Sequence, residues 1–240
     1  MKIKVASLIS GGGTTMEAIG KACLSGEIPF DLVCVISSDP KAGGIGKAKN
    51  LGIAEADILV INPEDFRIDG KVDQEKFGQA IMTELKKRKV DVVLQNGWMP
   101  LTPKNVIDEY QGAIFNQHPG PVPEFGGRGM YGQRVHAAVL EFRKMTGRDF
   151  STEAICQRVD PDFDMGAVVK SAQIEIRDDD TAESLAARVL PIEHRVQVEL
   201  LKDLASGNVH EVTRPPIVLA GEEKILEAAK QKAIKLYPGG

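Results

Sequence analysis

The chain has 240 residues, of which 42% are hydrophobic and 27% are charged, and its formal net charge is -4. This length can bury one large core or two small ones, and the composition is that of a soluble globular protein. The sequence is acidic overall and has no long basic run, which argues against a nucleic-acid binder. No apolar stretch reaches the length of a membrane span. Three scattered cysteines and an N-terminus that begins directly in a strand, without a signal-peptide pattern, favour a cytoplasmic protein.

Buried strands and amphipathic helices alternate in the first half of the sequence. Apolar runs predict strands over residues 2–9, 30–39, 56–62, 91–98 and 112–118. Helical spacing predicts helices from Thr14 onward, over 47–51, over 73–90 and over 102–110. In the last of these, Thr102 is expected to be the N-cap and Pro103 the first helical residue. The alternation predicts an α/β fold with a parallel, doubly wound sheet.

The pattern changes after residue 125. Glycines between Gly126 and Gly132 predict a loop, and a helix is expected over 132–145. Residues 151–159 and 171–176 predict two strands of an antiparallel extension. A long helix is expected over 180–207, with a kink or break at Pro191, and a last peripheral helix over 220–237. We therefore expect a domain over residues 1–210 and a C-terminal extension over 211–240 that packs on the same domain.

A glycine-rich turn, ISGGGTT, connects the first strand to the first helix. Glycines at such a turn let backbone N–H groups approach an anion, and the helix dipole favours negative charge there. Met16 stands where the dinucleotide-binding fingerprint needs its third glycine, so a free phosphate fits better than a pyrophosphate. A tight turn with a threonine that caps the helix explains the same residues equally well.

Asn116 and His118 lie at the end of a predicted strand, and Pro119, Pro121 and Pro123 stiffen the exit. Side chains two residues apart face the same side of a strand, and ligands bind at the carboxyl ends of parallel strands. An amide beside an imidazole suits a reaction that builds negative charge on an oxygen. For an isolated Asn-x-His pattern, however, local hydrogen bonding remains the simpler explanation.

Three carboxylates, Asp160, Asp162 and Asp164, lie in one short loop. They could bind a divalent cation, but no Glu occupies the closing position of an EF-hand loop. Asp160 and Asp162 are interpreted as solvated turn residues. Asp164 could point back at His118, where a carboxylate would favour the protonated imidazole.

Together, these motifs resemble the folate-dependent formyltransferase family, whose signature is Asn-x-His-Pro followed by Asp-x-Gly. The resemblance covers about Lys2 to Gly207 and is closest to the members that act on glycinamide ribonucleotide in purine synthesis. The motifs follow the family's order: LISGGGTT, VDVVLQNGWMPLTP, NQHPGPVPEFGGRGMYG, VDPDFDMG and ARVLPIEHRV. The resemblance implies a Rossmann-like fold, with a mostly parallel sheet, helices on both faces and a C-terminal antiparallel extension. It also implies 10-formyltetrahydrofolate as the formyl donor and no metal.

The resemblance further implies roles for individual residues. Asn116, His118 and Asp164 match the catalytic residues, and Asn116 with protonated His118 would stabilise a tetrahedral oxyanion. The expected substrate-binding residues are Gly12, Gly13, Thr14, Thr15, Pro119, Ile192 and Glu193. The expected folate-binding residues are Met99, Pro100, Leu101, Thr102, Asn116, Asp160, Pro161, Asp162, Phe163 and Asp164. The sequence departs from the family pattern at Gly12, Thr15, Pro100 and Gln157.

Two other functions are compatible with parts of the sequence. A formyltransferase that acts on another amine, such as an amino-sugar nucleotide, would share the chemistry. A nucleotide-binding oxidoreductase would use the glycine-rich turn and Asp39 at the end of the second strand, but it leaves Asn116, His118 and Asp164 unexplained. The expected partners are small-molecule substrates, without nucleic acid or membrane, for a monomer or a homodimer.

Overall fold

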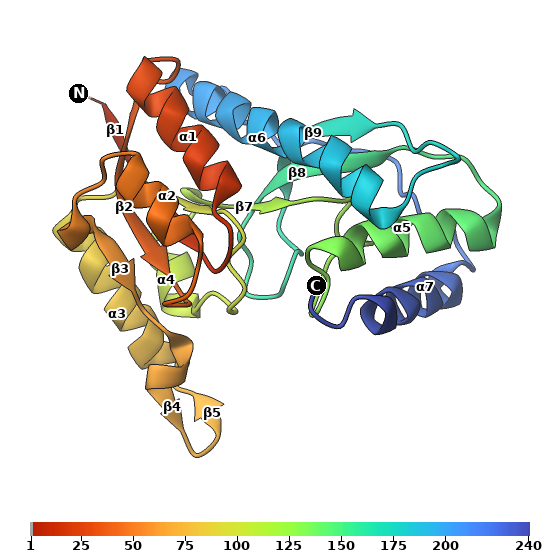
Figure 1. Ribbon diagram of the computed structural model, residues 1–240, viewed down its shortest axis with the longest axis horizontal. Coiled ribbons are helices and arrows are strands. Elements are labelled where there is room, and N and C mark those ends of the chain that lie inside the picture. Colours follow the sequence, from red (N-terminus) through yellow and green to blue (C-terminus); the bar gives the residue numbers. More distant parts are fainter. Residues whose placement is uncertain (1) are drawn as a thin grey trace.

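The computed structural model describes residues 2–240 and has a seven-stranded sheet at its centre (Figure 1). The strand order is β3-β2-β1-β6-β7-β8-β9; the first five are parallel, and the last two join antiparallel. The strands are β1 (Ile3–Ile9), β2 (Phe30–Ser37), β3 (Ile58–Val60), β6 (Val92–Gln95), β7 (Ile114–His118), β8 (Thr152–Arg158) and β9 (Val168–Ile174). The predicted mostly parallel sheet with an antiparallel extension is confirmed.

Helices cover both faces of this sheet (Figure 1). One face carries α1 (Thr14–Ser25) and α6 (Ala182–Ser206), which pack against each other, and the other carries α3 (Gln74–Lys87) and α4 (Lys104–Glu109). The remaining helices are α2 (Gly44–Asn50), α5 (Gln133–Thr146), α7 (Glu223–Leu236) and two short 3₁₀ turns, Glu55–Asp57 and Pro63–Phe66. The predicted last helix is thus present as α7, and it packs against α5. None of the helices within residues 2–240 has the length and apolarity that a membrane crossing requires.

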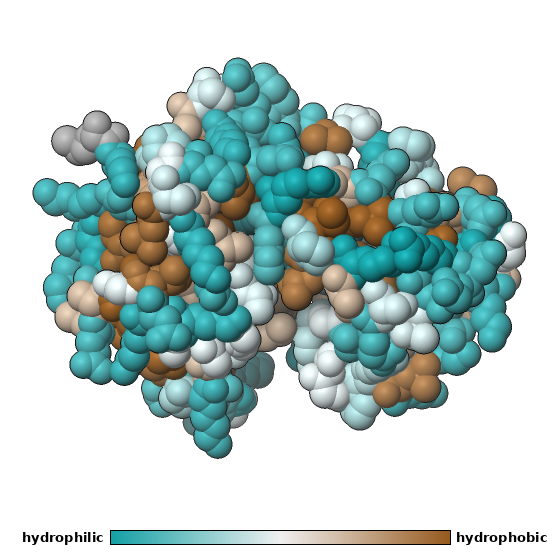
Figure 2. Space-filling model, turned by 45° about the horizontal axis from the view of Figure 1, so that its top comes forward, coloured by the Kyte–Doolittle hydropathy of each residue, from teal (hydrophilic) through white to brown (hydrophobic). Residues whose placement is uncertain are grey.

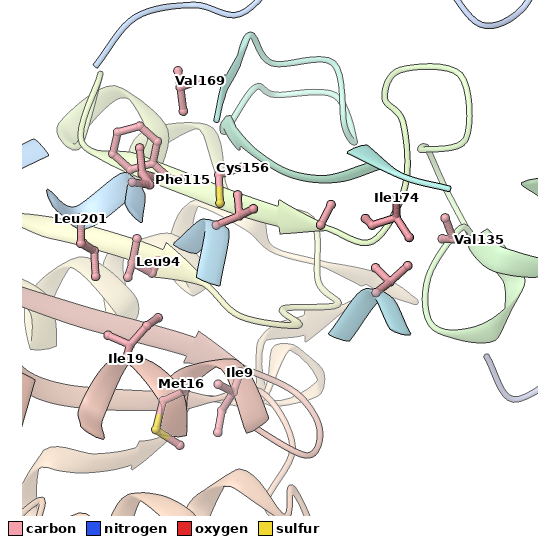
Figure 3. Packing of buried hydrophobic residues seen from close by; sticks show 14 of the residues in the cluster. Ile9, Met16, Ile19, Leu94, Phe115, Val135, Cys156, Val169, Ile174 and Leu201 are labelled. Atoms are coloured by element: carbon pink, nitrogen blue, oxygen red, sulfur yellow. The ribbon is translucent and has the colours of Figure 1, made fainter. Parts of the chain in front are cut away.

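The side chains of the central strands alternate between two cores, as the pleat of a strand requires. On the face of α1 and α6, Leu94 and Phe115 pack with residues such as Ile19 (Figure 3). On the face of α3 and α4, Val93 and Ile114 belong to the second core. This alternation decides to which face each polar residue at the end of β7 points.

The structure corrects two details of the helices. Helix α4 has Pro103 rather than Thr102 as its N-cap, because the Thr102 hydroxyl accepts a hydrogen bond from the Gln95 side chain. Helix α6 is continuous through Pro191, so the break, which was one of the two predicted alternatives, does not occur. The proline removes one backbone hydrogen bond, but buried residues on both sides of it, such as Val189 and Val196, hold the two halves on the same core.

A small hairpin was not predicted. Strands β4 (Arg67–Ile68) and β5 (Lys71–Val72) pair antiparallel around Asp69-Gly70. Both turn residues have positive φ, 49° and 78°, which is the requirement of a two-residue turn of the Asp-Gly type. The dipeptide was a usable signal in the sequence.

Candidate active site

The loops that follow β1, β6 and β7 meet at the carboxyl edge of the sheet. After β1 the chain moves to β2 on one side and later returns to β6 on the other, so the strand order reverses at β1. The loops are tied together there, because Ser10 N donates to Gly97 O at 2.9 Å and Met99 N donates to Ser10 Oγ at 2.9 Å. The surface is hollowed between the part built from the N-terminal elements and the part built from α5 and α7 (Figure 2). This is the position at which open α/β sheets bind ligands.

The three predicted catalytic side chains come together at this edge. Asn116 and His118 are on β7, and Asp164 lies in the connection between β8 and β9. Asn116 Nδ2 donates to Asp164 Oδ1 at 3.1 Å, and His118 Nε2 lies 3.7 Å from Asp164 Oδ2. An amide, an imidazole and a carboxylate therefore share one small volume.

Asp164 is held by neutral N–H donors. Besides Asn116, Gln157 Nε2 donates to its Oδ1 at 2.8 Å and Gly127 N donates to its Oδ2 at 2.9 Å. Its side chain is only 9% exposed, and its φ of 58° is unusual for a residue other than glycine. Both oxygens are thus fixed in direction. Gln157 and Gly127 were absent from the predicted site. Gln157 is the register partner of Asn116 across the antiparallel pair, so knowledge of the strand pairing would have found it.

His118 presents one ring nitrogen to the site. The side chain is 5% exposed, and Nδ1 donates to the Gly120 carbonyl at 3.0 Å. Nε2 is buried, has no hydrogen-bond partner among residues 2–240 and faces the carboxylate of Asp164 at 3.7 Å. It is therefore the ring atom that can bind a ligand.

A second histidine lies behind this group. His136 is buried on α5. Burial, with a smaller contribution from the neighbouring His118, lowers the pKa of His136 to about 4. His136 is therefore neutral at neutral pH.

Glu193 does not join the triad, but lies beyond the opposite face of β7. Because side chains alternate, Gln117 points away from Asn116 and His118, and its amide donates to the Glu193 carboxylate on α6. Burial raises the pKa of Glu193 to about 7, and the hydrogen bond from Gln117 opposes that rise. The predicted neighbour Ile192 packs against the main core. Gln117 was not among the predicted site residues.

The glycine-rich turn leaves backbone donors free. The N-cap of α1 is Gly13, with a φ of 64°, and no side chain caps the helix, so the predicted alternative of a threonine cap is wrong. The first intrahelical bond runs from Glu17 N to Gly13 O, so the preceding N–H groups of Thr14 and Thr15 have no helical acceptor. A Cβ at Gly13 would lie 2.7 Å from the Gly44 Cα, which accounts for the glycine. An anion can approach this turn closely.

The predicted folate segments lie in the loops on either side of the triad. The side chains of Met99 and Leu101 are exposed after β6, and Met165, beside Asp164, is 59% exposed. Thr102 instead faces inward, and its hydroxyl accepts a hydrogen bond from Gln95. The remaining predicted residues of these segments are half-buried or exposed: Pro100, Asp160, Pro161, Asp162 and Phe163. Pro119, which follows His118, is half-buried.

The acidic loop forms a turn rather than a metal site. Asp162 N donates to Asp160 Oδ1 at 3.1 Å, and both residues are exposed, as predicted for solvated turn residues. Within residues 2–240, no group of three or more His, Cys, Asp or Glu side chains is arranged to hold a metal ion.

We expect Gly166→Ala to destabilise the fold by more than about 2 kcal/mol, because its Cβ would collide with the carbonyl oxygen of Arg158. The backbone of the turn that carries Asp164 would have to move. Denaturant unfolding measures the effect. Gly46→Ala is the matched control: it lies in α2, its Cβ would meet no atom within 4 Å, and it should stabilise the helix by up to about 1 kcal/mol. Equal stability of the Gly166 variant and the unaltered protein would contradict this account of the glycine.

Comparisons with known proteins agree with the geometry. The chain is 29% identical over 206 residues to the phosphoribosylglycinamide formyltransferase of Haemophilus influenzae, covering 86% of this chain and 89% of that protein. It is 33% identical over 209 residues to the chloroplastic phosphoribosylglycinamide formyltransferase of Vigna unguiculata, covering 86% of this chain. It spans 62% of the length of that plant relative and 64% of its counterpart from Arabidopsis thaliana, slightly under two thirds in each case.

Solved structures and a family model give the same result. Glycinamide ribonucleotide transformylase 1 from Symbiobacterium toebii superimposes with a TM-score of 0.75 at 27% identity, covering 89% of this chain and 92% of that one. Phosphoribosylglycinamide formyltransferase from Brucella melitensis gives 0.69 at 32% identity, covering 88% and 100%. The formyl transferase model matches residues 3–201 and so includes the whole triad. The protein therefore belongs to the formyl transferase family.

Proposed function

We propose that the protein transfers the formyl group of 10-formyltetrahydrofolate to the amine of glycinamide ribonucleotide. The observation that carries the proposal is the meeting of Asn116, His118 and Asp164 at the sheet edge that also bears the glycine-rich turn. The names of the relatives from Haemophilus influenzae and Symbiobacterium toebii support this acceptor. Small-molecule substrates fit the formyl transferase family as a whole.

The chemistry follows from the free donors of the site. The substrate amine attacks the formyl carbon, and the formyl oxygen becomes an oxyanion. His118 donates from Nε2 as an imidazolium, since Nδ1–H is already used by Gly120, and Asp164 stabilises that cation. The Asn116 amide has a second N–H besides the one that Asp164 accepts. Collapse of the tetrahedral intermediate breaks the bond between the formyl carbon and the folate nitrogen. The folate nitrogen then takes the proton that the amine loses.

Two groups of residues are proposed to bind the phosphate and the glycinamide end of the ribonucleotide. The N–H groups of the turn from Gly12 to Thr15 suit the phosphate, because they lack helical acceptors and lie at the positive end of α1. Glu193 would receive the glycinamide end. Its helix, α6, packs against both α1 and the strands β7 and β8, which connects the phosphate turn with the catalytic strand.

The folate cosubstrate fits the loops beside the triad. Its fused ring has a polar edge but apolar faces, its aminobenzoyl ring is apolar, and Met99, Leu101 and Met165 expose apolar side chains there. Flexible thioethers adapt well to such a surface. The oxidoreductase alternative gains nothing from the structure, because Met16, at the position of the third fingerprint glycine, is fully buried in the main core.

A spectrophotometric transfer assay tests the proposal. The purified protein is mixed with glycinamide ribonucleotide and a 10-formyl folate, and absorbance follows the release of the deformylated folate. We expect turnover of at least about 1 per second that requires both substrates. Parallel reactions replace the ribonucleotide with an amino-sugar nucleotide. Turnover with that amine alone would reassign the acceptor, and absence of both turnover and folate binding would refute a folate-dependent transfer.

A further inference from the structure

The loop between β7 and α5, residues 119–132, forms one wall of the Asp164 site. Gly127 N donates to Asp164 Oδ2 at 2.9 Å. A Cβ on Gly126 would lie 2.5 Å from the Asp164 Cβ, so the backbone of the loop packs directly against this residue. The direction of the carboxylate therefore depends on where the 119–132 loop is held.

The C-terminal segment, residues 208–240, holds that loop from outside. Lys230 Nζ on α7 donates to the Gly126 carbonyl at 2.9 Å, one residue before the amide that binds Asp164. Arg214 Nη2 donates to the Val122 carbonyl at 2.6 Å, and its guanidinium pairs with Glu124. These two cations thus bind successive parts of the loop.

A third connection closes the other end of the loop. Arg134, in the first turn of α5, donates to the Gly129 carbonyl at 3.0 Å. The same guanidinium donates to the carbonyls of Tyr237 and Pro238, at 2.7 and 2.6 Å. One side chain therefore fastens the end of the chain to the end of the loop.

The contact from Lys230 to Gly126 comes from outside the region that the family model matches. The formyl transferase model ends at residue 201, and the whole C-terminal segment follows it. We propose that this segment is a clamp for the site and that Lys230 is a positioning residue, which orients Asp164 through Gly126 and Gly127. This proposal rests on the proposed function for its effect on rate, but its structural consequence can be measured without substrate.

The environment of Lys230 supports a positioning role. The side chain is half-buried, and burial lowers the pKa of its ammonium, while the negative charges of Glu227, Asp164 and Glu124 act in the opposite direction. An ammonium that is removed from water needs its acceptor, so Lys230 has a strong preference for the Gly126 carbonyl. Consecutive glycines lose more backbone freedom on ordering than other residues, so the loop gains most from such an anchor.

Lys230→Met removes the anchor and keeps the length of the side chain. Amide hydrogen exchange at Gly127, measured by NMR on the full chain without substrate, is expected to become about 10-fold faster, because the loop then opens more often. In the transfer assay, kcat should fall about 10-fold, since a small displacement of Asp164 misorients His118. KM for the ribonucleotide should stay the same.

Lys232→Met is the matched control. Lys232 is on the same helix, but it pairs with Glu141 of α5 at 2.7 Å and does not contact the loop. It should change neither measurement, because an exposed ion pair contributes little. In an Asp164→Ala background, Lys230→Met should lower kcat no further, as expected if both residues act through the same carboxylate.

The outcomes separate the clamp from the proposed function. Unchanged exchange at Gly127 in Lys230→Met would overturn the clamp, and so would a uniform loss of protection over the whole protein, which would indicate lost stability instead. An additive fall in kcat in the Asp164→Ala background would also overturn it. If the unaltered protein transfers no formyl group to glycinamide ribonucleotide, the proposed function fails, and the exchange at Gly127 still decides the clamp.

Discussion

Replacing His118 with alanine is expected to lower kcat for formyl transfer by about 10²–10³-fold, the usual effect of removing one donor to an oxyanion. The loss should be this large because Nε2 is buried without a partner and water cannot easily replace it. KM for the ribonucleotide should change little, since the residues proposed to bind it, the turn from Gly12 to Thr15 and Glu193, are elsewhere. Steady-state kinetics with both substrates varied measure the two constants separately.

His210→Ala is the matched control for this variant. His210 is exposed and lies in the C-terminal segment, in a stretch without helix or strand, so its removal should leave kcat unchanged. Both variants must unfold at the temperature of the unaltered protein, within a few degrees, for the comparison to hold. A His118 variant that retained more than about a third of kcat would remove this imidazole from the chemical step.

Glu193 is expected to make stability depend on pH. Its folded pKa is about 7, against 4.5 for the ordinary carboxyl, so the folded state binds more protons between these values than the unfolded state. The free energy of unfolding therefore falls as pH rises through this window and levels off above it. At 1.36 kcal/mol per pKa unit, the ionised carboxylate costs the fold about 3 kcal/mol.

Glu193→Gln removes this dependence and keeps an oxygen that can accept from Gln117. Relative to the unaltered protein, the variant should gain up to about 3 kcal/mol between about pH 5 and pH 8, measured by denaturant unfolding at several pH values. Glu199→Gln, on the same helix but in an exposed pair with Arg195, should not change the pH profile. Parallel profiles for the unaltered protein and the Glu193 variant would show that this carboxyl does not titrate in that range.

Local patterns in the sequence were sufficient for most of the fold. Apolar runs predicted the parallel strands, and apolar residues at helical spacing predicted α3 and α5. The errors arose where tertiary contacts prevail: Thr102 binds Gln95 instead of capping α4, and packing on both sides carries α6 through Pro191. The Asp69-Gly70 hairpin was missed, although its turn dipeptide is a strong local signal.

The candidate site was also predictable from the sequence only in part. Alternation along a strand placed Asn116 and His118 on one side. The loop pattern only suggested that Asp164, 48 residues from Asn116, points back at His118, and the family resemblance made this contact an expectation. The neighbours of Asp164 depend on strand pairing and loop packing, which no local pattern contains. Gln157 reaches the carboxylate through the antiparallel register of β7 and β8, and Gly127 reaches it through the 119–132 loop.

The position of Trp98 makes one small region of the protein optically visible. It is the sole tryptophan of the sequence, it is buried, and its ring stacks on Phe77 at a centroid distance of 6.1 Å. Met99, the next residue, begins the loop where the folate ring is proposed to lie. All tryptophan emission of the protein therefore arises beside that loop. A fluorescence titration with folate can thus report binding at this loop without a label, because no other tryptophan contributes to the signal.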